Sequence, residues 1–142
     1  MLVLGLDPST TSTGYGLVEG DGRRQVAYID CGCFRPPRKA SLDQRLRVIF
    51  DGVNEVLQER NPDAVAIEGS FFGKDADAAA KLGEVRGVLR IAVNLAGIES
   101  AVYSPATIKK ALTGNGQATK ESVQYMVAKT LKMKKLPSPL EA

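Results

Sequence analysis

The sequence contains no histidine and only two cysteines, Cys31 and Cys33, among its 142 residues. Without histidine, every Ser–His or Cys–His nucleophilic mechanism and every His-rich zinc site is excluded. Two thiols with no further Cys or His ligand cannot complete a zinc site either. His-rich zinc sites and the histidine-based hydrolytic triads are therefore excluded, and the two cysteines are better explained as small buried strand residues.

Long apolar runs and a secretion signal are also missing. No stretch approaches the roughly 20 apolar residues that a membrane-spanning helix needs. The first apolar run has no basic segment ahead of it and meets Asp7 at once, unlike a signal peptide. We therefore expect a reducing cytoplasm as the location.

The composition is that of one globular domain. Hydrophobic residues make up 44% and charged residues 25%, so the whole chain, residues 1–142, is expected to form a single domain with its own core. The net charge of +3 is unevenly distributed. Residues 1–100 contain 12 Lys and Arg against 14 Asp and Glu, whereas residues 101–142 contain 7 Lys against 2 Glu. A basic segment of this kind is typical of a polyanion partner, although a solvated helix face explains it equally well.

Apolar periodicity and turn residues predict an α/β fold. Strands are expected at residues 2–7, 14–19, 25–34, 64–68 and 100–103. Helices are expected at residues 41–60, 75–95, 104–114 and 119–132. The first three strands, joined by short links, predict an antiparallel meander. The order as a whole predicts a five-stranded mixed sheet flanked by helices.

Two carboxylates, Asp7 and Glu68, each end an apolar strand. If these strands are neighbours, both carboxylates project from the same edge of the sheet. Two close carboxylates without a local basic partner repel each other, and a hard divalent cation relieves that repulsion. Paired metal ions about 3.5–4 Å apart would then hydrolyse a phosphodiester. The alternative is that Asp7 caps the turn that follows it and Glu68 lies on the surface.

Five motifs in sequence order resemble one known family. They are residues 5–9 (GLDPS), 13–16 (TGYG), 66–68 (AIE), 71–74 (FFGK) and 79–87 (AAKLGEVRG). Together they are similar to the RuvC family of bacterial Holliday junction resolvases, which belongs to the RNase H-like (retroviral integrase) superfamily. The resemblance implies a homodimer that makes paired nicks in strands of like polarity at a four-way DNA junction. It also implies Mg²⁺ or Mn²⁺, with two ions in each active site of the full-length protein, the partners RuvA and RuvB, and a bacterial cytoplasm.

The resemblance also implies roles for individual residues. Asp7 and Glu68 match two of the family's catalytic, metal-binding acids. Phe71 and Phe72 match an aromatic loop whose exposed ring would stack on an unpaired base, although core packing explains two adjacent phenylalanines equally well. Basic positions that would neutralise backbone phosphates are Lys74, Lys81, Lys109 and Lys120.

The small residues of the expected helix at 75–95 allow another element to approach closely. The resemblance assigns this helix to a dimer interface. The residues concerned are Ala79, Ala80, Gly83, Arg86 and Gly87. Packing of the same residues on the protein's own sheet is the alternative. Arg86 is also a weaker candidate than the four lysines for neutralising a backbone phosphate, and it is equally suited to an ion pair.

The sequence departs from the family pattern at its C-terminus. The family has four acidic or metal-binding positions, and the last two lie in a terminal helix with an Asp-x-x-Asp or His-x-x-Asp pattern. Here a Pro-containing linker at residues 136–142 ends the sequence before that helix. We therefore expect a truncated RNase H-like domain that lacks its final catalytic helix. With two of four ligands, low metal affinity and impaired cleavage are expected.

Two other functions remain open. One is a catalytically deficient protein that binds junctions without cutting them. The other is a nucleotide-binding domain of the sugar kinase and actin type, which also opens with an apolar strand, an Asp and a Ser/Thr/Gly loop. That class needs a second related domain, for which 142 residues leave no space.

Overall fold

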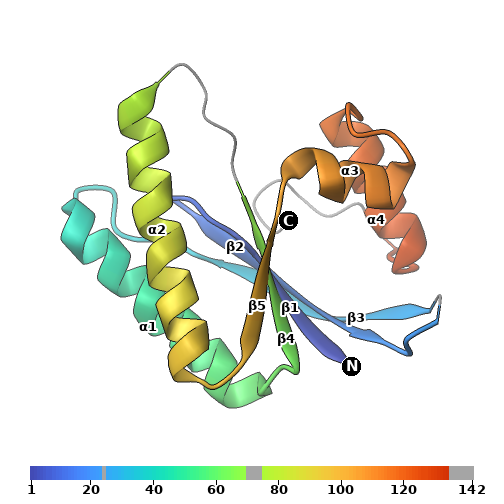
Figure 1. Cartoon of the computed structure of the whole chain (residues 1–142), viewed down its shortest axis with the longest axis horizontal. Coiled ribbons are helices and arrows are strands. Elements are labelled where there is room, and N and C mark those ends of the chain that lie inside the picture. The colour runs from blue at the N-terminus through green and yellow to red at the C-terminus, as the bar shows by residue number, and fades with distance from the viewer. Residues whose placement is uncertain (24, 70–74, 135–142) are drawn as a thin grey trace.

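Five strands form one mixed sheet in the computed structural model, which describes residues 1–23, 25–69 and 75–134. The strands are β1 (Leu2–Asp7), β2 (Thr13–Gly20), β3 (Val26–Phe34), β4 (Ala64–Glu68) and β5 (Glu99–Tyr103). The helices are α1 (Leu42–Arg60), α2 (Ala76–Leu95), α3 (Pro105–Thr113) and α4 (Lys120–Thr130). Helices α1 and α2 lie on one side of the sheet, and the α3–α4 hairpin lies on the other (Figure 1). The predicted fold class is confirmed.

The strand order is β3-β2-β1-β4-β5, with β1 at the centre. Strands β1, β2 and β3 pair antiparallel, as the predicted meander requires. Strands β4 and β5 continue the sheet in parallel with β1. Parallel neighbours end at the same edge, so β1 and β4 deliver their last residues to one place.

Local signals explain where the helices begin. Ser41 caps α1, with its side chain accepting from the Gln44 amide while Gln44 returns a hydrogen bond to the Ser41 amide. Ser104 caps α3 and is followed by a proline at the first helical position. The predicted bounds match the observed ones for β1 and β4 and differ by one or two residues elsewhere, most at α4, which ends at Thr130 rather than at residue 132.

The core lies between the sheet and helices α1 and α2. Alternate residues of β1 and β4 face it, as the two-residue period of a strand dictates. The buried apolar residues of these four elements are Leu4, Leu6, Ile49, Val53, Val56, Leu57, Val65, Ile67, Val85, Leu89, Ala92 and Val93. Because Leu6 and Ile67 face the core, Asp7 and Glu68 belong to the opposite face of the sheet.

That opposite face consists of small side chains near the centre of the sheet. A Cβ atom built on Gly16 would meet nothing within 4 Å, and one on Gly5 would meet only the Gly16 carbonyl oxygen, at 3.8 Å. Neither α3 nor α4 contains a fully buried residue. Among the described residues, the face that carries the two acids is therefore open above these glycines.

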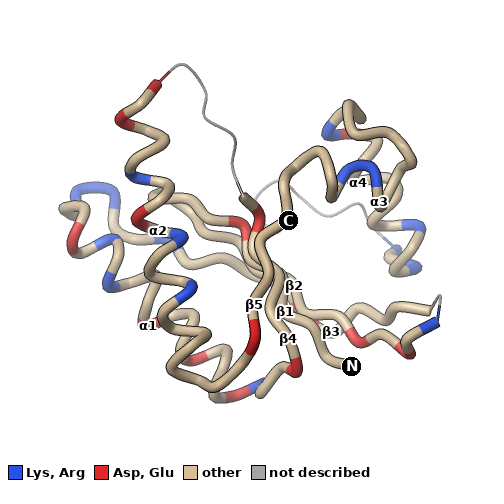
Figure 2. Tube along the Cα trace, viewed as in Figure 1, with Lys and Arg blue, Asp and Glu red and all other residues tan. Residues whose placement is uncertain are grey.

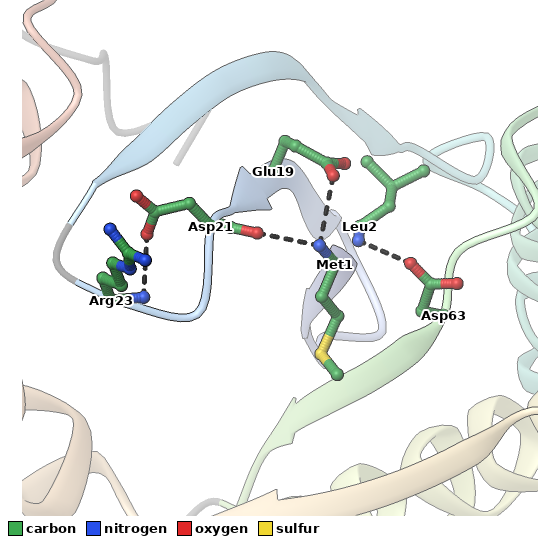
Figure 3. Close-up of polar contacts among 7 residues, drawn as sticks. Met1, Leu2, Glu19, Asp21, Arg23 and Asp63 are labelled. Carbon is green, nitrogen blue, oxygen red and sulfur yellow. Dashed lines mark hydrogen bonds and ion pairs between the residues drawn. The ribbon is translucent and has the colours of Figure 1, made fainter.

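The start of β1 is fastened on both sides (Figure 3). The Leu2 amide donates to Asp63 Oδ2 at 2.7 Å, and the Asp63 amide donates to the Leu2 carbonyl oxygen at 2.8 Å. The Met1 ammonium donates to Glu19 Oε1 at 3.1 Å and to the Gly20 carbonyl oxygen at 2.8 Å. These contacts fix the register of β1 against β4 and β2 at the end of the sheet opposite to Asp7.

Two further observations concern the described helices and the two cysteines. No described helix is long and apolar enough to cross a membrane. Cys31 and Cys33 are free thiols, and both are half-buried on β3.

Candidate active site

Asp7 and Glu68 meet at the carboxyl ends of β1 and β4. The parallel register pairs Leu6 with Ile67, so the next residue of each strand stands beside the other. A side-chain hydrogen bond joins the two carboxyl groups. Acidic residues gather at these two strand ends in Figure 2. The structure thus brings together the two residues that the sequence singled out.

The pair is electrostatically strained. Burial, the negative charge of Asp7 and the hydrogen bond that protonated Glu68 donates to Asp7 together raise the pKa of Glu68 from 4.5 to about 7, while Lys109 acts to lower it. A carboxyl group with this pKa holds a proton that a cation can replace. The site therefore favours additional positive charge.

The loop after Asp7 is held by its own hydroxyl groups. The buried Thr13 hydroxyl donates to the Ser9 carbonyl oxygen at 2.6 Å and accepts from the Ser9 amide at 3.1 Å. Arg45 of α1 donates to the Thr10 carbonyl oxygen at 3.1 Å. Arg45 also reaches the carbonyl oxygens of Arg38 and Ala40, which ties two loops together. The sequence did not single out Arg45, because no local sequence pattern indicates that its side chain contacts Thr10, which lies 35 residues earlier in the chain.

The predicted DNA-binding lysines occupy different environments. Lys109 is half-buried on α3 and acts on Glu68, so the structure brings it to the acidic pair. Lys120 is exposed at the first position of α4. Lys81 is exposed on α2 and forms an ion pair with Asp77 at 3.0 Å. Phe71, Phe72 and Lys74 lie outside the described residues.

Lysines dominate the surface of the α3–α4 hairpin. Described residues 101–134 contain six lysines and one glutamate. Figure 2 shows these basic positions spread along α3 and α4, on the opposite side of the strand ends from α2. A polyanion lying between this hairpin and the strand ends would meet both positive charge and the acidic pair.

The predicted interface residues of α2 differ in how far they are exposed to solvent. Ala80 and Gly87 are exposed, Gly83 and Ala79 are half-buried, and a Cβ atom on either glycine would meet nothing within 4 Å. The buried face of the helix lies on the other side and packs into the core. Arg86 is half-buried, with its guanidinium beside Gly69 at the end of β4.

The donor set fits a hard divalent cation. Asp7 and Glu68 supply carboxylate oxygens, and Mg²⁺ commonly binds one or two carboxylates while waters and phosphate oxygens fill its other positions. Residues 1–23, 25–69 and 75–134 contain no cluster of three or more His, Cys, Asp or Glu suited to a metal. The described site thus offers two protein ligands for a cation.

Comparisons with known proteins agree on one family. The family model described as crossover junction endodeoxyribonuclease RuvC matches residues 3–142. The chain belongs to the RuvC family. RuvC from Shewanella loihica is 43% identical over 136 residues, which cover 96% of this chain and 78% of that protein. RuvC from Chlorobium phaeovibrioides is 40% identical over 141 residues, covering 99% of this chain and 75% of that protein.

Solved structures of RuvC give the same result. Thermus thermophilus RuvC in complex with a Holliday junction substrate is 34% identical with a TM-score of 0.91, and the match covers 98% of this chain and 84% of that one. The yeast mitochondrial Holliday junction resolvase, at 13% identity and a TM-score of 0.65, shares the fold. The RuvC resemblance and the nuclease class predicted from the sequence are confirmed, and RuvC membership implies dependence on a divalent metal ion.

Proposed function

We propose that this chain is a structure-selective endonuclease that resolves four-way DNA junctions by paired phosphodiester hydrolysis. The observation that supports it most directly is the pair of mutually strained carboxylates at one sheet edge, opposite a lysine-rich helical hairpin. The Thermus thermophilus relative, solved with a Holliday junction substrate, supplies the substrate class. The actin-type alternative loses its motivation, since RuvC motifs account for the same opening strand and loop.

Asp7 and Glu68 would hold the cation, as Mg²⁺ or Mn²⁺, with two ions in each active site. When bound, the metal supplies Lewis-acid activation of water and of the scissile phosphate. A bound cation would favour the ionised form of Glu68, because its positive charge would offset the repulsion from Asp7. Lys109 holds a phosphate of the cut strand next to the acids, and Lys81 and Lys120 hold phosphates farther away. Lys74, which lies outside the described residues, is expected to hold a phosphate as well. Phe71 and Phe72 stack on bases at the branch point.

We propose further that α2 forms the interface of a homodimer. Its outward face combines Ala80, Gly83 and Gly87 with the exposed apolar side chains of Ile91 and Leu95, which are 50% and 70% exposed. Small residues permit close helix approach, and the apolar ones provide area to bury. Ala79 and Arg86 flank this face. Partnership with RuvA and RuvB and a cytoplasmic location rest on RuvC membership alone.

Cleavage of a labelled four-way junction tests the nuclease proposal. With Mg²⁺ or Mn²⁺, we expect paired nicks in strands of like polarity, formed slowly because the described site supplies two of the family's four ligands, and Asp7→Asn should abolish them while junction binding persists. Asp21→Asn, which changes an exposed acid in the β2–β3 turn, is the matched control and should leave cleavage intact. Junction binding without cleavage by the unmodified chain would support the non-catalytic alternative, and absence of junction binding would refute both.

A further inference from the structure

One cation near the active site lacks a partner among the described residues. Arg86 of α2 is half-buried, yet it forms no hydrogen bond and no ion pair with residues 1–23, 25–69 or 75–134. Arginine stays protonated in proteins and carries five N–H donors. Removing such a group from water without a partner costs free energy. This cost is recovered if an anion binds there.

The guanidinium lies at the catalytic edge of the sheet. Arg86 Nη1 is 3.6 Å from the position that a Cβ atom of Gly69 would occupy. Gly69 directly follows Glu68, and its amide donates to the Tyr103 carbonyl oxygen at 2.7 Å, which extends the β4–β5 pairing. Val102 flanks the same glycine, since its Cγ1 would lie 2.7 Å from that Cβ atom. Arg86 is thus placed against backbone one residue beyond a catalytic acid.

Its orientation separates Arg86 from the outward face of α2. Consecutive residues of a helix differ by about 100° in direction. Gly87 is exposed on the outward face, whereas Arg86 turns toward Gly69 and the strand ends. A dimer formed through Gly83 and Gly87 therefore leaves the guanidinium free to bind a different ligand.

We propose that Arg86 binds a backbone phosphate of the DNA strand that is cut, adjacent to the scissile phosphate. The planar guanidinium fork matches two phosphate oxygens, which a lysine in the same place does not. This role rests on the proposed junction endonuclease activity. Of the two roles that the sequence left open for Arg86, it favours the substrate site over the dimer interface that the resemblance implies.

The test compares Arg86→Leu and Arg86→Lys with Arg90→Leu, in which an exposed arginine one turn farther along α2 is removed. Binding to a four-way junction and to linear duplex is measured in EDTA, which prevents hydrolysis, over a series of salt concentrations. For Arg86→Leu we expect about tenfold weaker binding. The slope of log K against log salt should fall by about 0.9 for each protomer bound. Arg86→Lys should keep the slope and lose part of the affinity, and Arg90→Leu should change both less than Arg86→Leu.

Three outcomes would overturn the role of Arg86. They are an equal loss in Arg90→Leu, dissociation of the dimer in Arg86→Leu by sedimentation, and a melting temperature lowered by several degrees in that variant. The last two would indicate an interface role and a structural role, whereas a phosphate ligand leaves both properties unchanged. If the protein binds linear duplex as tightly as the four-way junction, the proposed junction-selective function is refuted. The change in the slope of log K against log salt in Arg86→Leu still tests whether Arg86 binds a phosphate. If it binds neither DNA, both proposals are refuted.

Discussion

Replacing Glu68 by glutamine should stabilise the metal-free protein at pH 8. In the folded chain the pKa of Glu68 is raised to about 7, chiefly by burial and by Asp7. Above this pH the fold contains two adjacent negative charges at one sheet edge. Glutamine keeps the shape of the side chain, removes one charge and can donate a hydrogen bond to Asp7. The change that removes a proposed metal ligand thus also removes a source of instability.

The magnitude follows from the difference between the two pKa values. Glu68 titrates at about 7 in place of 4.5, and each unit corresponds to about 1.4 kcal/mol, which gives a ceiling of roughly 3 kcal/mol. Solvent reaches part of the side chain and screens its charge, so we expect about half, near 1.5 kcal/mol. For a domain of this size that is an increase of about 5 °C in melting temperature.

The pH dependence has a definite sign. Because the folded state holds the proton more tightly than the unfolded state, stability falls as pH rises between 4.5 and about 7. Below this window Glu68 is neutral in both states, and above it the penalty is constant. Melting curves in EDTA should therefore show Glu68→Gln and the unmodified chain equal at pH 4 and separated at pH 8.

Mg²⁺ and a control complete this experiment. Mg²⁺ at ten times its dissociation constant should raise the stability of the unmodified chain by about 1.4 kcal/mol and leave Glu68→Gln nearly unchanged. Glu55→Gln, which removes an exposed charge from α1, should show no pH-dependent gain. A gain of the same size at pH 4 and pH 8, or none at pH 8, would refute the argument from charge repulsion.

Three further changes test neighbouring parts of the structure. Lys109→Met should move the pKa of Glu68 above about 7, measured by carboxyl-carbon NMR in EDTA, whereas Lys110→Met should not; equal shifts would contradict a specific effect of the Lys109 charge. Asp63→Ala removes the acceptor of the first β1 amide and should lower the free energy of unfolding by about 1 kcal/mol in denaturant titrations, with cleavage retained at low temperature. Gly87→Gln should dissociate the proposed dimer in sedimentation experiments without lowering the melting temperature, because its Cβ meets nothing within 4 Å and glycine is a poor helix former.

Local sequence patterns predicted the elements well because local chemistry determines them. The Ser41–Gln44 capping box and the Ser104–Pro105 start act over four residues, and both are present in the structure. The pairing of Asp7 with Glu68 depended on a condition that no local pattern could establish, namely that β1 and β4 are neighbours. The parallel register supplies that condition, and the Leu2–Asp63 contacts maintain it from the far end of the strands.

Tertiary contacts account for what sequence reasoning left open. The two acids were expected to lack a basic partner, judged from their local sequence alone, yet Lys109 reaches Glu68 from a helix 41 residues farther along the chain. The hydrogen bonds from Arg45 to the loop carbonyl oxygens and the orientation of Arg86 likewise depend on how α1 and α2 pack on the sheet.

The position of the acidic pair opposite the lysine-rich α3–α4 hairpin explains the uneven distribution of charge along the sequence. The slightly acidic first 100 residues include the carboxylate pair, which repels phosphate, while the lysines that attract phosphate are concentrated on α3 and α4. A polyanion held by the hairpin can approach the acids only when their charge is neutralised. A divalent cation cancels the two negative charges and also offers positions to phosphate oxygens. Tight approach of the substrate to the site therefore requires the same ion that hydrolysis requires, whereas binding to the lysines does not, so metal removal should abolish cleavage and spare most of the affinity for DNA.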